Sequence, residues 1–203
     1  RLCGKRIEEI ERLASGGGLD RLITMLDEPS WALRRAVVAA LAASGPKAVG
    51  LLCEALQSRR GSESRIAATV DALAVISADA DPALAAMAEN AEIPVLADIA
   101  QILGRRRTTS AISTVIGLSR HPDDNVAAAA IEALGRIGGR AAVDSLVEAV
   151  ESGNFFRAFP AIEVLGRSGD PRAVAPLTAL LEKPQYATEA ARAVLRLAWI
   201  LGH

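Results

Sequence analysis

The tripeptide Leu-Gly-Arg occurs three times in this chain, at Leu103-Gly104-Arg105, Leu134-Gly135-Arg136 and Leu165-Gly166-Arg167. Successive copies are 31 residues apart. A column of leucines continues this pattern at Leu41, Leu73 and Leu195, with steps of 30 to 32 residues. A fixed period of this size is typical of a solenoid, in which each unit buries its apolar face only against its neighbours. The spacing therefore predicts an array of stacked repeats.

The composition favours helices that pack closely through small side chains. Of the 203 residues, 51% are hydrophobic but only 3% are aromatic. Alanine and leucine carry most of the apolar surface, whereas a β-sandwich needs more β-branched and aromatic residues. We therefore expect an all-α chain.

The charge balance excludes a strong attraction to nucleic acid. With 23 basic and 24 acidic side chains, the net charge is -1. No apolar run of about 18 residues is present to span a membrane. Cys3 and Cys53 are too few for a disulfide framework, which favours a cytoplasmic location. The sequence predicts neither a nucleic-acid partner nor a membrane partner.

A one-sided amphipathic helix opens the chain and is expected to cap the array. It runs from Lys5 to Ser15 and ends at three glycines, residues 16–18. Six repeats of two helices each are expected to follow in a single domain, 1–203. After the cap at 1–18, the repeats are predicted over 19–45, 46–78, 79–107, 108–139, 140–169 and 170–203.

The glycine after the column leucine lies inside the second helix (helix B) of its repeat. Glycine costs about 1 kcal/mol there relative to alanine. This cost recurs at Gly104, Gly135 and Gly166. The pattern predicts that neighbouring helices approach too closely at these points for a Cβ atom.

Two motifs carry a resemblance to a known family. One is Gly169-Asp170-Pro171-Arg172-Ala173-Val174-Ala175-Pro176-Leu177, and the other is Glu132-Ala133-Leu134-Gly135-Arg136-Ile137-Gly138. The chain resembles the HEAT-like repeat family in its short bacterial form, named after phycobilisome lyase subunits. The resemblance implies a right-handed α-α superhelix, an α-solenoid, with the B helices on its concave side. It specifies no function, because this scaffold serves binding, assembly and a few enzymes.

The enzymes known on this scaffold require residues that this chain lacks. Deoxyhypusine hydroxylase holds two irons with repeated His-Glu pairs, but neither His121 nor His203 is followed by glutamate. The HEAT-like DNA glycosylases need a basic, aromatic channel. We therefore predict no catalytic residues, no metal site and no cofactor. The alternative is a phycobilin-lyase-like or chaperone-type subunit of an enzyme acting on a protein-bound cofactor.

Charged side chains form two columns on the predicted B helices. Glu132 with Arg136, and Glu163 with Arg167, have the spacing of ion pairs within one helix, and Arg105 precedes them. Such pairs neutralise themselves and stabilise a helix by about 0.2–0.5 kcal/mol each. Alternatively, the arginine row binds carboxylates or phosphates of a partner.

Four of the six aromatic residues lie at related positions of two successive repeats. Three of them, Phe155, Phe156 and Phe159, lie shortly before the column leucine Leu165. Tyr186 takes the repeat position of Phe156 in the next repeat. They either fill the turns of repeats 5 and 6 or form an exposed patch. An exposed patch would suit binding, because aromatic and arginine side chains supply most interface hot spots.

Together these features predict a non-catalytic scaffold or regulatory module that binds a protein or peptide. The predicted contact residues on the concave face of repeats 4 to 6 are Arg105, Glu132, Arg136, Phe156, Phe159, Glu163, Arg167 and Tyr186. Other domains of a longer chain are a further candidate partner.

The last B helix is expected to end the array. Aligned on Leu195, it places Arg192 and Arg196 where earlier repeats carry apolar residues that face the next repeat. Buried unpaired arginines cost several kcal/mol, so a polar outer face is expected there. The apolar residues Trp199 to Leu201 stand against this expectation.

Overall fold

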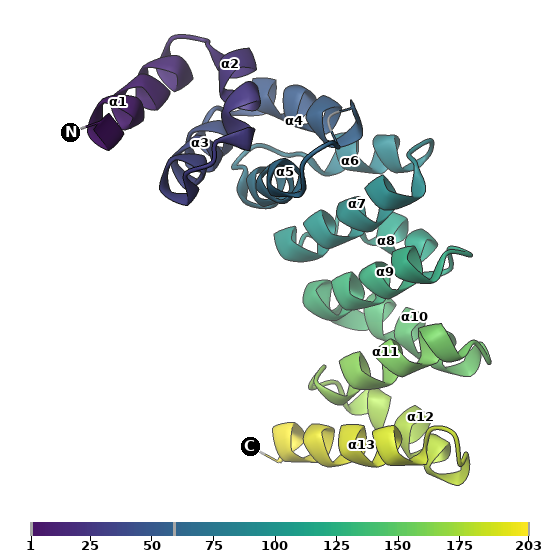
Figure 1. Cartoon of the computed structure of the whole chain (residues 1–203). Helices are drawn as coiled ribbons and strands as arrows, with labels where there is room; N and C mark the ends of the chain where they lie inside the picture. Colours follow the sequence, from purple (N-terminus) through teal and green to yellow (C-terminus); the bar gives the residue numbers. More distant parts are fainter. Residues whose placement is uncertain (1, 59, 203) are drawn as a thin grey trace. The chain divides into compact units, whose positions relative to one another are not determined.

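The structure is a computed structural model that describes residues 2–58 and 60–202, and every regular element in these ranges is helical. His203 and the side chain of Cys3 lie outside the described residues. The α-helices are α1 (Leu2–Ser15), α2 (Leu19–Thr24), α3 (Trp31–Ala43), α4 (Pro46–Ser58), α5 (Glu63–Val75), α6 (Asp81–Ala88), α7 (Ile93–Arg106), α8 (Ile112–Ser119), α9 (Asp124–Ile137), α10 (Gly139–Glu151), α11 (Phe155–Gly166), α12 (Val174–Ala179) and α13 (Ala187–Leu201). Short 3₁₀ helices occupy Met25–Asp27, Pro171–Ala173 and Leu180–Glu182. The predicted all-α solenoid is confirmed (Figure 1).

The chain forms two compact units, residues 1–95 and 96–203. In the first unit, α1 packs on α2 and α3, and α3 packs on α5. Helices α2, α4 and α6 form a second layer, in which α4 contacts both α2 and α6. Arg6 of α1 binds Glu28 with Nη1–Oε1 and Nη2–Oε2 distances of 3.0 and 2.7 Å, which holds α1 to the turn before α3.

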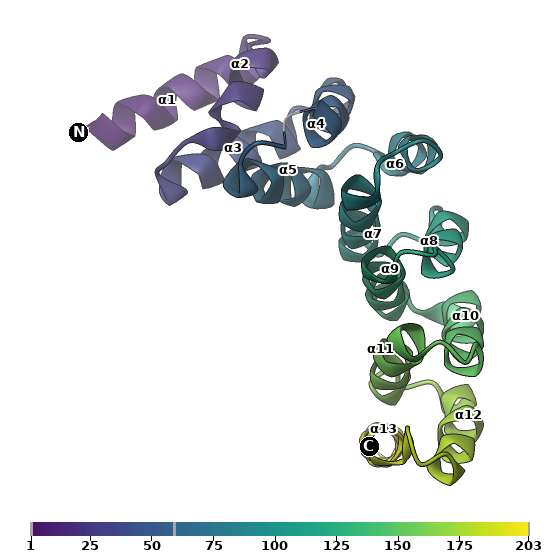
Figure 2. The ribbon, with the colours of Figure 1, turned by 45° about the vertical axis from the view of Figure 1, so that its right-hand side comes forward.

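The second unit also has two layers. Figure 2 shows α7, α9, α11 and α13 stacked on one side, with α8, α10 and α12 on the other. The pairs α8/α9, α10/α11 and α12/α13 are helical hairpins, and α11 contacts both α9 and α13. We refer to α7, α9, α11 and α13 as the B helices of this unit.

The column leucines form the core of both units. Leu41, Leu73, Leu103, Leu134 and Leu165 are fully buried. Polar residues cap the N-termini of α3, α5, α9 and α11. Asp123, for example, accepts hydrogen bonds from the backbone N–H groups of Asn125 and Val126 at 3.0 and 3.1 Å.

Gly104, Gly135 and Gly166 lie where neighbouring B helices touch, as predicted. A Cβ atom on Gly104 would lie 2.6 Å from the Cα of Ala133, and one on Gly166 would lie 2.7 Å from the Cα of Ala193. At Gly135 the obstacle is a side chain, because the Cβ would overlap a methyl group of Val164. Only glycine allows these backbone approaches.

The prediction that Leu195 belongs to the buried column is wrong. Leu195 is 72% exposed, and the buried positions of α13 are instead Ala190, Ala193 and Leu197, with Tyr186 buried at its N-cap. The glycine contacts explain the shift. Gly104 and Gly135 each meet the residue 29 positions later, whereas Gly166 meets Ala193, 27 positions later. Helix α13 is therefore offset by two residues from the regular period.

Because of this offset, Arg192 and Arg196 do not form the expected polar end face. Relative to α11, positions in α13 advance by 29 residues, so Arg192 matches Glu163 and Arg196 matches Arg167. The stacking position of Gly166 is taken by Leu195. Arg192 and Arg196 consequently continue the charged columns, while the outer side of α13 presents Leu195 and Trp199, the latter 69% exposed.

None of the helices in the described ranges has the length and apolar content needed to cross a membrane.

Candidate functional site

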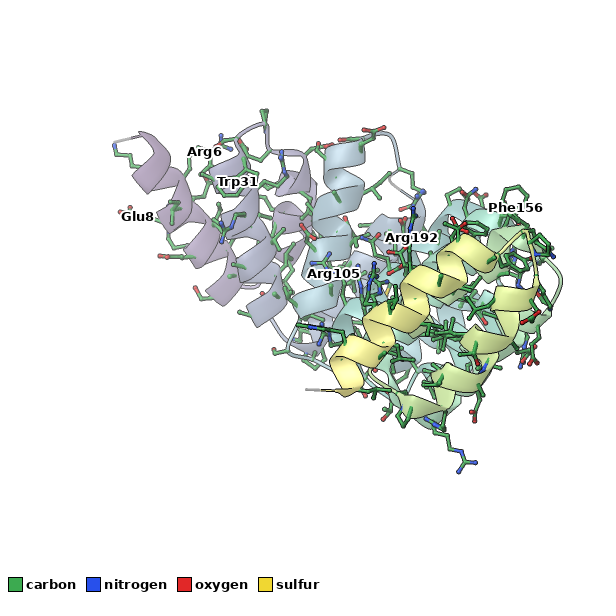
Figure 3. The ribbon with its side chains drawn as sticks, turned by 90° about the horizontal axis from the view of Figure 1, so that it is seen from below. Arg6, Glu8, Trp31, Arg105, Phe156 and Arg192 are labelled. Atoms are coloured by element: carbon green, nitrogen blue, oxygen red, sulfur yellow. The ribbon has the colours of Figure 1, made fainter. Side chains whose placement is uncertain are left out.

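The solvent side of the B helices in the second unit, which we call the B-helix face, carries most of the predicted contact residues. Arg136, Glu163 and Arg167 are exposed, and Arg105 and Glu132 are half-buried. Figure 3 shows the side chains of this unit, with Phe156 near the N-terminal ends of α11 and α13 and Arg192 part-way along α13.

The ion pair on this face joins neighbouring repeats rather than residues of one helix. Arg167 of α11 donates from Nη2 to both carboxylate oxygens of Glu132 on α9, at 2.7 and 2.6 Å. The predicted pairs Glu132–Arg136 and Glu163–Arg167 do not form. The Arg167 side chain extends toward α9, the preceding B helix. The spacing of residues along one helix does not reveal such a contact.

The equivalent ion pair cannot form at Arg136, because the residue that it would reach on the preceding B helix is not a carboxylate. In α7, Gln101 takes the position that Glu132 has in α9, because the two are 31 residues apart. Within the described part of the chain, Arg136 forms no ion pair, and its side chain is exposed. Arg136 is thus a cation available to a partner.

The aromatic residues form one cluster at the start of α11. The ring centroids of Phe155 and Phe159 are 4.4 Å apart, and that of Tyr186 lies 6.0 Å from Phe159. Phe155 and Phe156 are 49% and 63% exposed, whereas Tyr186 is 5% exposed. Both sequence interpretations therefore hold in part: Tyr186 fills the turn and supports the cluster, and the two phenylalanines are at the surface.

The backbone of α11 presents these rings at its first turn. Asn154 caps the helix by accepting a hydrogen bond from the N–H of Phe156 at 2.9 Å. Pro160 lies inside the helix and has no N–H to offer the carbonyl of Phe156 four residues earlier. Capping fixes the backbone of the turn from which the two exposed rings project, and the proline leaves a carbonyl next to them without its helical donor.

A cleft of about 260 Å³ lies beside this cluster, between α11 and α13. It is lined by Phe159, Ile162, Glu163, Glu189, Arg192, Ala193 and Arg196. Two of these residues, Phe159 and Glu163, were predicted as contact residues. The cleft joins the aromatic cluster to the charged columns.

Sequence reasoning missed Glu189, Arg192 and Arg196 as site residues. The alignment on Leu195 assigned the two arginines to an end face. The signal that could have found them is the burial pattern of α13, since Ala190, Ala193 and Leu197 have the spacing of one helix face. On that pattern the arginines fall on the B-helix face.

The first unit holds an aromatic–arginine pair that the sequence analysis did not single out. Trp31 begins α3 and is exposed, and the guanidinium carbon of Arg35 lies 4.9 Å from its ring centroid. Trp31 precedes Leu41 by ten residues, as Phe155 precedes Leu165. Exposed rings therefore recur at the same repeat position in both units.

The described residues contain no group of three or more histidine, cysteine, aspartate or glutamate side chains placed to hold a metal ion. Cys53 is half-buried in α4, and burial raises the pKa of its thiol from 9.0 to about 11. A thiol with a raised pKa is a poor nucleophile at neutral pH, because little of it is thiolate.

Comparison with known proteins identifies the repeats. A family model for HEAT repeats matches residues 80–159, and the model for the PBS lyase HEAT-like repeat matches residues 161–183. A search of curated protein sequences gave no match.

Solved structures with a similar fold are distant in sequence. An engineered protein is 20% identical with a TM-score of 0.47, covering 90% of this chain and 97% of its own. A designed armadillo repeat protein is 16% identical with a TM-score of 0.47, covering 88% and 99%. The complex of CpcE and CpcF of phycocyanin lyase from Nostoc is 20% identical with a TM-score of 0.42, covering 96% and 88%. At these TM-scores, the similarities say nothing about the partner or the activity of this chain.

The two matched families cover the region in which the helical hairpins, buried leucines and close glycine contacts recur most regularly. This chain belongs to the HEAT-like repeat family.

Proposed function

We propose that this protein is a non-catalytic interaction scaffold that binds a protein or peptide on the B-helix face of α9, α11 and α13. The observation that carries the proposal is the cleft between α11 and α13 together with the exposed rings of Phe155 and Phe156 at its end. Aromatic and arginine side chains dominate interface energetics, and both gather here.

The contact residues follow from exposure. Phe156, Phe159, Glu163, Arg136 and Arg167 present surface to a partner. Arg105 and Glu132 lie at the edge, and Tyr186 acts from below by supporting the rings. The self-neutralised pair Glu132–Arg167 contributes less than the unpaired Arg136, because part of the binding energy of Arg167 is already used within the chain.

Site-specific photocrosslinking tests this function. A photoreactive phenylalanine analogue replaces Phe156 on the proposed site, and replaces Ala141 on α10 as a control, because Ala141 is exposed on the other helical layer. After exposure to cell extract, a specific adduct is expected at position 156 and not at 141. Mass spectrometry identifies the adduct, and the partner is then purified.

With the purified partner, Phe159→Ala and Arg136→Glu should each weaken binding by more than about 1 kcal/mol. Arg140→Glu on α10 should leave affinity unchanged, because Arg140 is exposed on the layer away from the site. Equal adducts at both positions, or silent substitutions at both Phe159 and Arg136 in a folded protein, would show that the cluster is structural. The lyase-type alternative has a different readout: transfer of a chromophore to an acceptor protein.

A further inference from the structure

The cleft between α11 and α13 contains an open version of the ion pair seen one repeat earlier. At the preceding junction, Glu132 of α9 and Arg167 of α11 are joined at 2.6 Å. The equivalent residues at the next junction are Glu163 of α11 and Arg196 of α13. Both line the cleft, yet within the described ranges neither side chain forms a hydrogen bond or an ion pair. The space between them is accessible to a ligand.

Two further charged side chains in the cleft are also unpaired. Glu189 and Arg192 line it without an ion-pair or hydrogen-bonding partner in the described part of the chain. Arg192 and Arg196 are four residues apart on α13, so their guanidinium groups lie on one face of the helix. Like charges at this spacing repel each other, and this repulsion is relieved by an anion that both can bind. A carboxylate suits the planar donors of arginine, because it accepts two parallel hydrogen bonds.

The α11 wall of the cleft also presents apolar side chains beside Glu163. The ring of Phe159 is half-buried and held from behind by Phe155 and Tyr186, with centroid distances of 4.4 and 6.0 Å. Ile162 adds to this wall and is almost fully buried. A preformed, supported ring loses little conformational entropy when an apolar side chain packs on it. The carboxylates of Glu163 and Glu189 can accept backbone N–H groups of the same ligand.

We propose that this cleft binds an extended acidic peptide segment of the partner. An aspartate or glutamate lies between Arg192 and Arg196, and an apolar side chain packs on Phe159. This inference rests on the proposed scaffold function and specifies the chemistry of its partner. The evidence for an acidic rather than a basic segment is that the two cations are adjacent on one helix, while the two carboxylates come from different helices.

The geometry sets the spacing in the peptide. Tyr186 is the N-cap residue of α13, and its ring centroid lies 6.0 Å from that of Phe159. The midpoint between the two arginines is eight residues further along the chain, which is about 12 Å at the rise of a helix. An extended chain advances about 3.3 Å per residue, so about three to four residues separate the apolar side chain from the acidic one.

Fluorescence polarisation with synthetic peptides tests the proposal. The probe is a fluorescein-labelled peptide with a phenylalanine followed, three and four residues later, by two aspartates. Matched peptides carry asparagine or lysine in place of the aspartates. The full chain is expected to bind the aspartate peptide at least tenfold more tightly than either matched peptide, with an affinity that falls as salt is added.

Charge reversal in the protein provides the control. The double variant Arg192→Glu, Arg196→Glu should lose at least tenfold in affinity for the aspartate peptide and gain binding of the lysine peptide. Arg140→Glu, which reverses one charge on α10, should leave both affinities unchanged. Circular dichroism and thermal unfolding verify that each variant is folded. The gain of lysine binding is a positive readout that a misfolded variant cannot give.

The possible failures are distinct. If the wild-type chain binds the three peptides equally, or if the double variant still prefers aspartate, the acidic-segment proposal is wrong. Should specific crosslinking at position 156 persist in that case, the scaffold function stands with a partner of other chemistry. Loss of both signals overturns both proposals.

Discussion

The guanidinium of Arg167 on α11 binds the carboxylate of Glu132 on α9, with an Nη2–Oε2 distance of 2.6 Å. The two residues are 35 positions apart in the sequence and belong to successive repeats. Each also has an oppositely charged residue four positions away in its own helix, and neither pairs with it. The B-helix face is therefore linked between repeats.

A double-mutant cycle on Glu132 and Arg167 should show a small coupling. Both side chains are about two-fifths exposed, so we expect about 0.2–1 kcal/mol, which decreases at high salt. Denaturant unfolding of Glu132→Gln, Arg167→Gln and the double variant measures it. A cycle on Arg136 with Glu132 serves as control and should give no coupling. Coupling of Glu132 to Arg136 but not to Arg167 would mean that the ion pair forms within α9.

Substituting alanine for the stacked glycines should destabilise the fold. Gly166→Ala places a methyl group 2.7 Å from the Cα of Ala193, and overpacking of this kind costs about 1–3 kcal/mol. This cost exceeds the gain of about 1 kcal/mol from removing a helical glycine. Gly117→Ala in α8 is the matched control, because nothing lies within 4 Å of its added Cβ. Thermal unfolding should show a lower Tm for Gly166→Ala and an unchanged or higher Tm for Gly117→Ala.

The leucine column can be tested at its regular and its shifted end. Leu165→Ala should cost about 2–5 kcal/mol, since Leu165 is fully buried. Leu195→Ala should change the unfolding free energy by less than about 0.5 kcal/mol, since Leu195 is 72% exposed. Leu197→Ala should resemble Leu165→Ala. Equal losses of unfolding free energy for Leu165→Ala and Leu195→Ala would show that the repeat period continues unbroken through α13.

Stability should fall at high pH because of Cys53. Burial raises the pKa of this thiol from 9.0 to about 11, so the folded protein disfavours the thiolate more than the unfolded chain does. The stabilisation is complete below pH 9 and is lost as the pH rises from about 9 to about 11. Unfolding free energies of the wild type and Cys53→Ala measure the effect, in a Cys3→Ser background that leaves Cys53 as the only thiol. If the two curves run parallel across this pH range, the pKa of the thiol is not raised.

The sequence alone determined the helical repeats. The recurrence of Leu103, Leu134 and Leu165 reflects burial of one helix face, and Gly104 and Gly166 reflect the approach of the next helix. Such patterns are readable because burial on a helix repeats with the 3.6-residue turn of that same helix. The arginine row and the aromatic cluster were also found in this way, since their residue types are unusual in an alanine- and leucine-rich chain.

Only the tertiary structure decided which side chains meet. The two-residue offset of α13 depends on how its hairpin packs against α11, and it moved Arg192 and Arg196 from an expected end face into the cleft. Tyr186 became a buried support because the rings of Phe155 and Phe159 lie over it. Glu132 of α9 pairs with Arg167 of α11 because contacts between helices depend on the relative rotation of the helices. Spacing along one chain records the faces of each helix, whereas the packing of separate helices determines which faces come together.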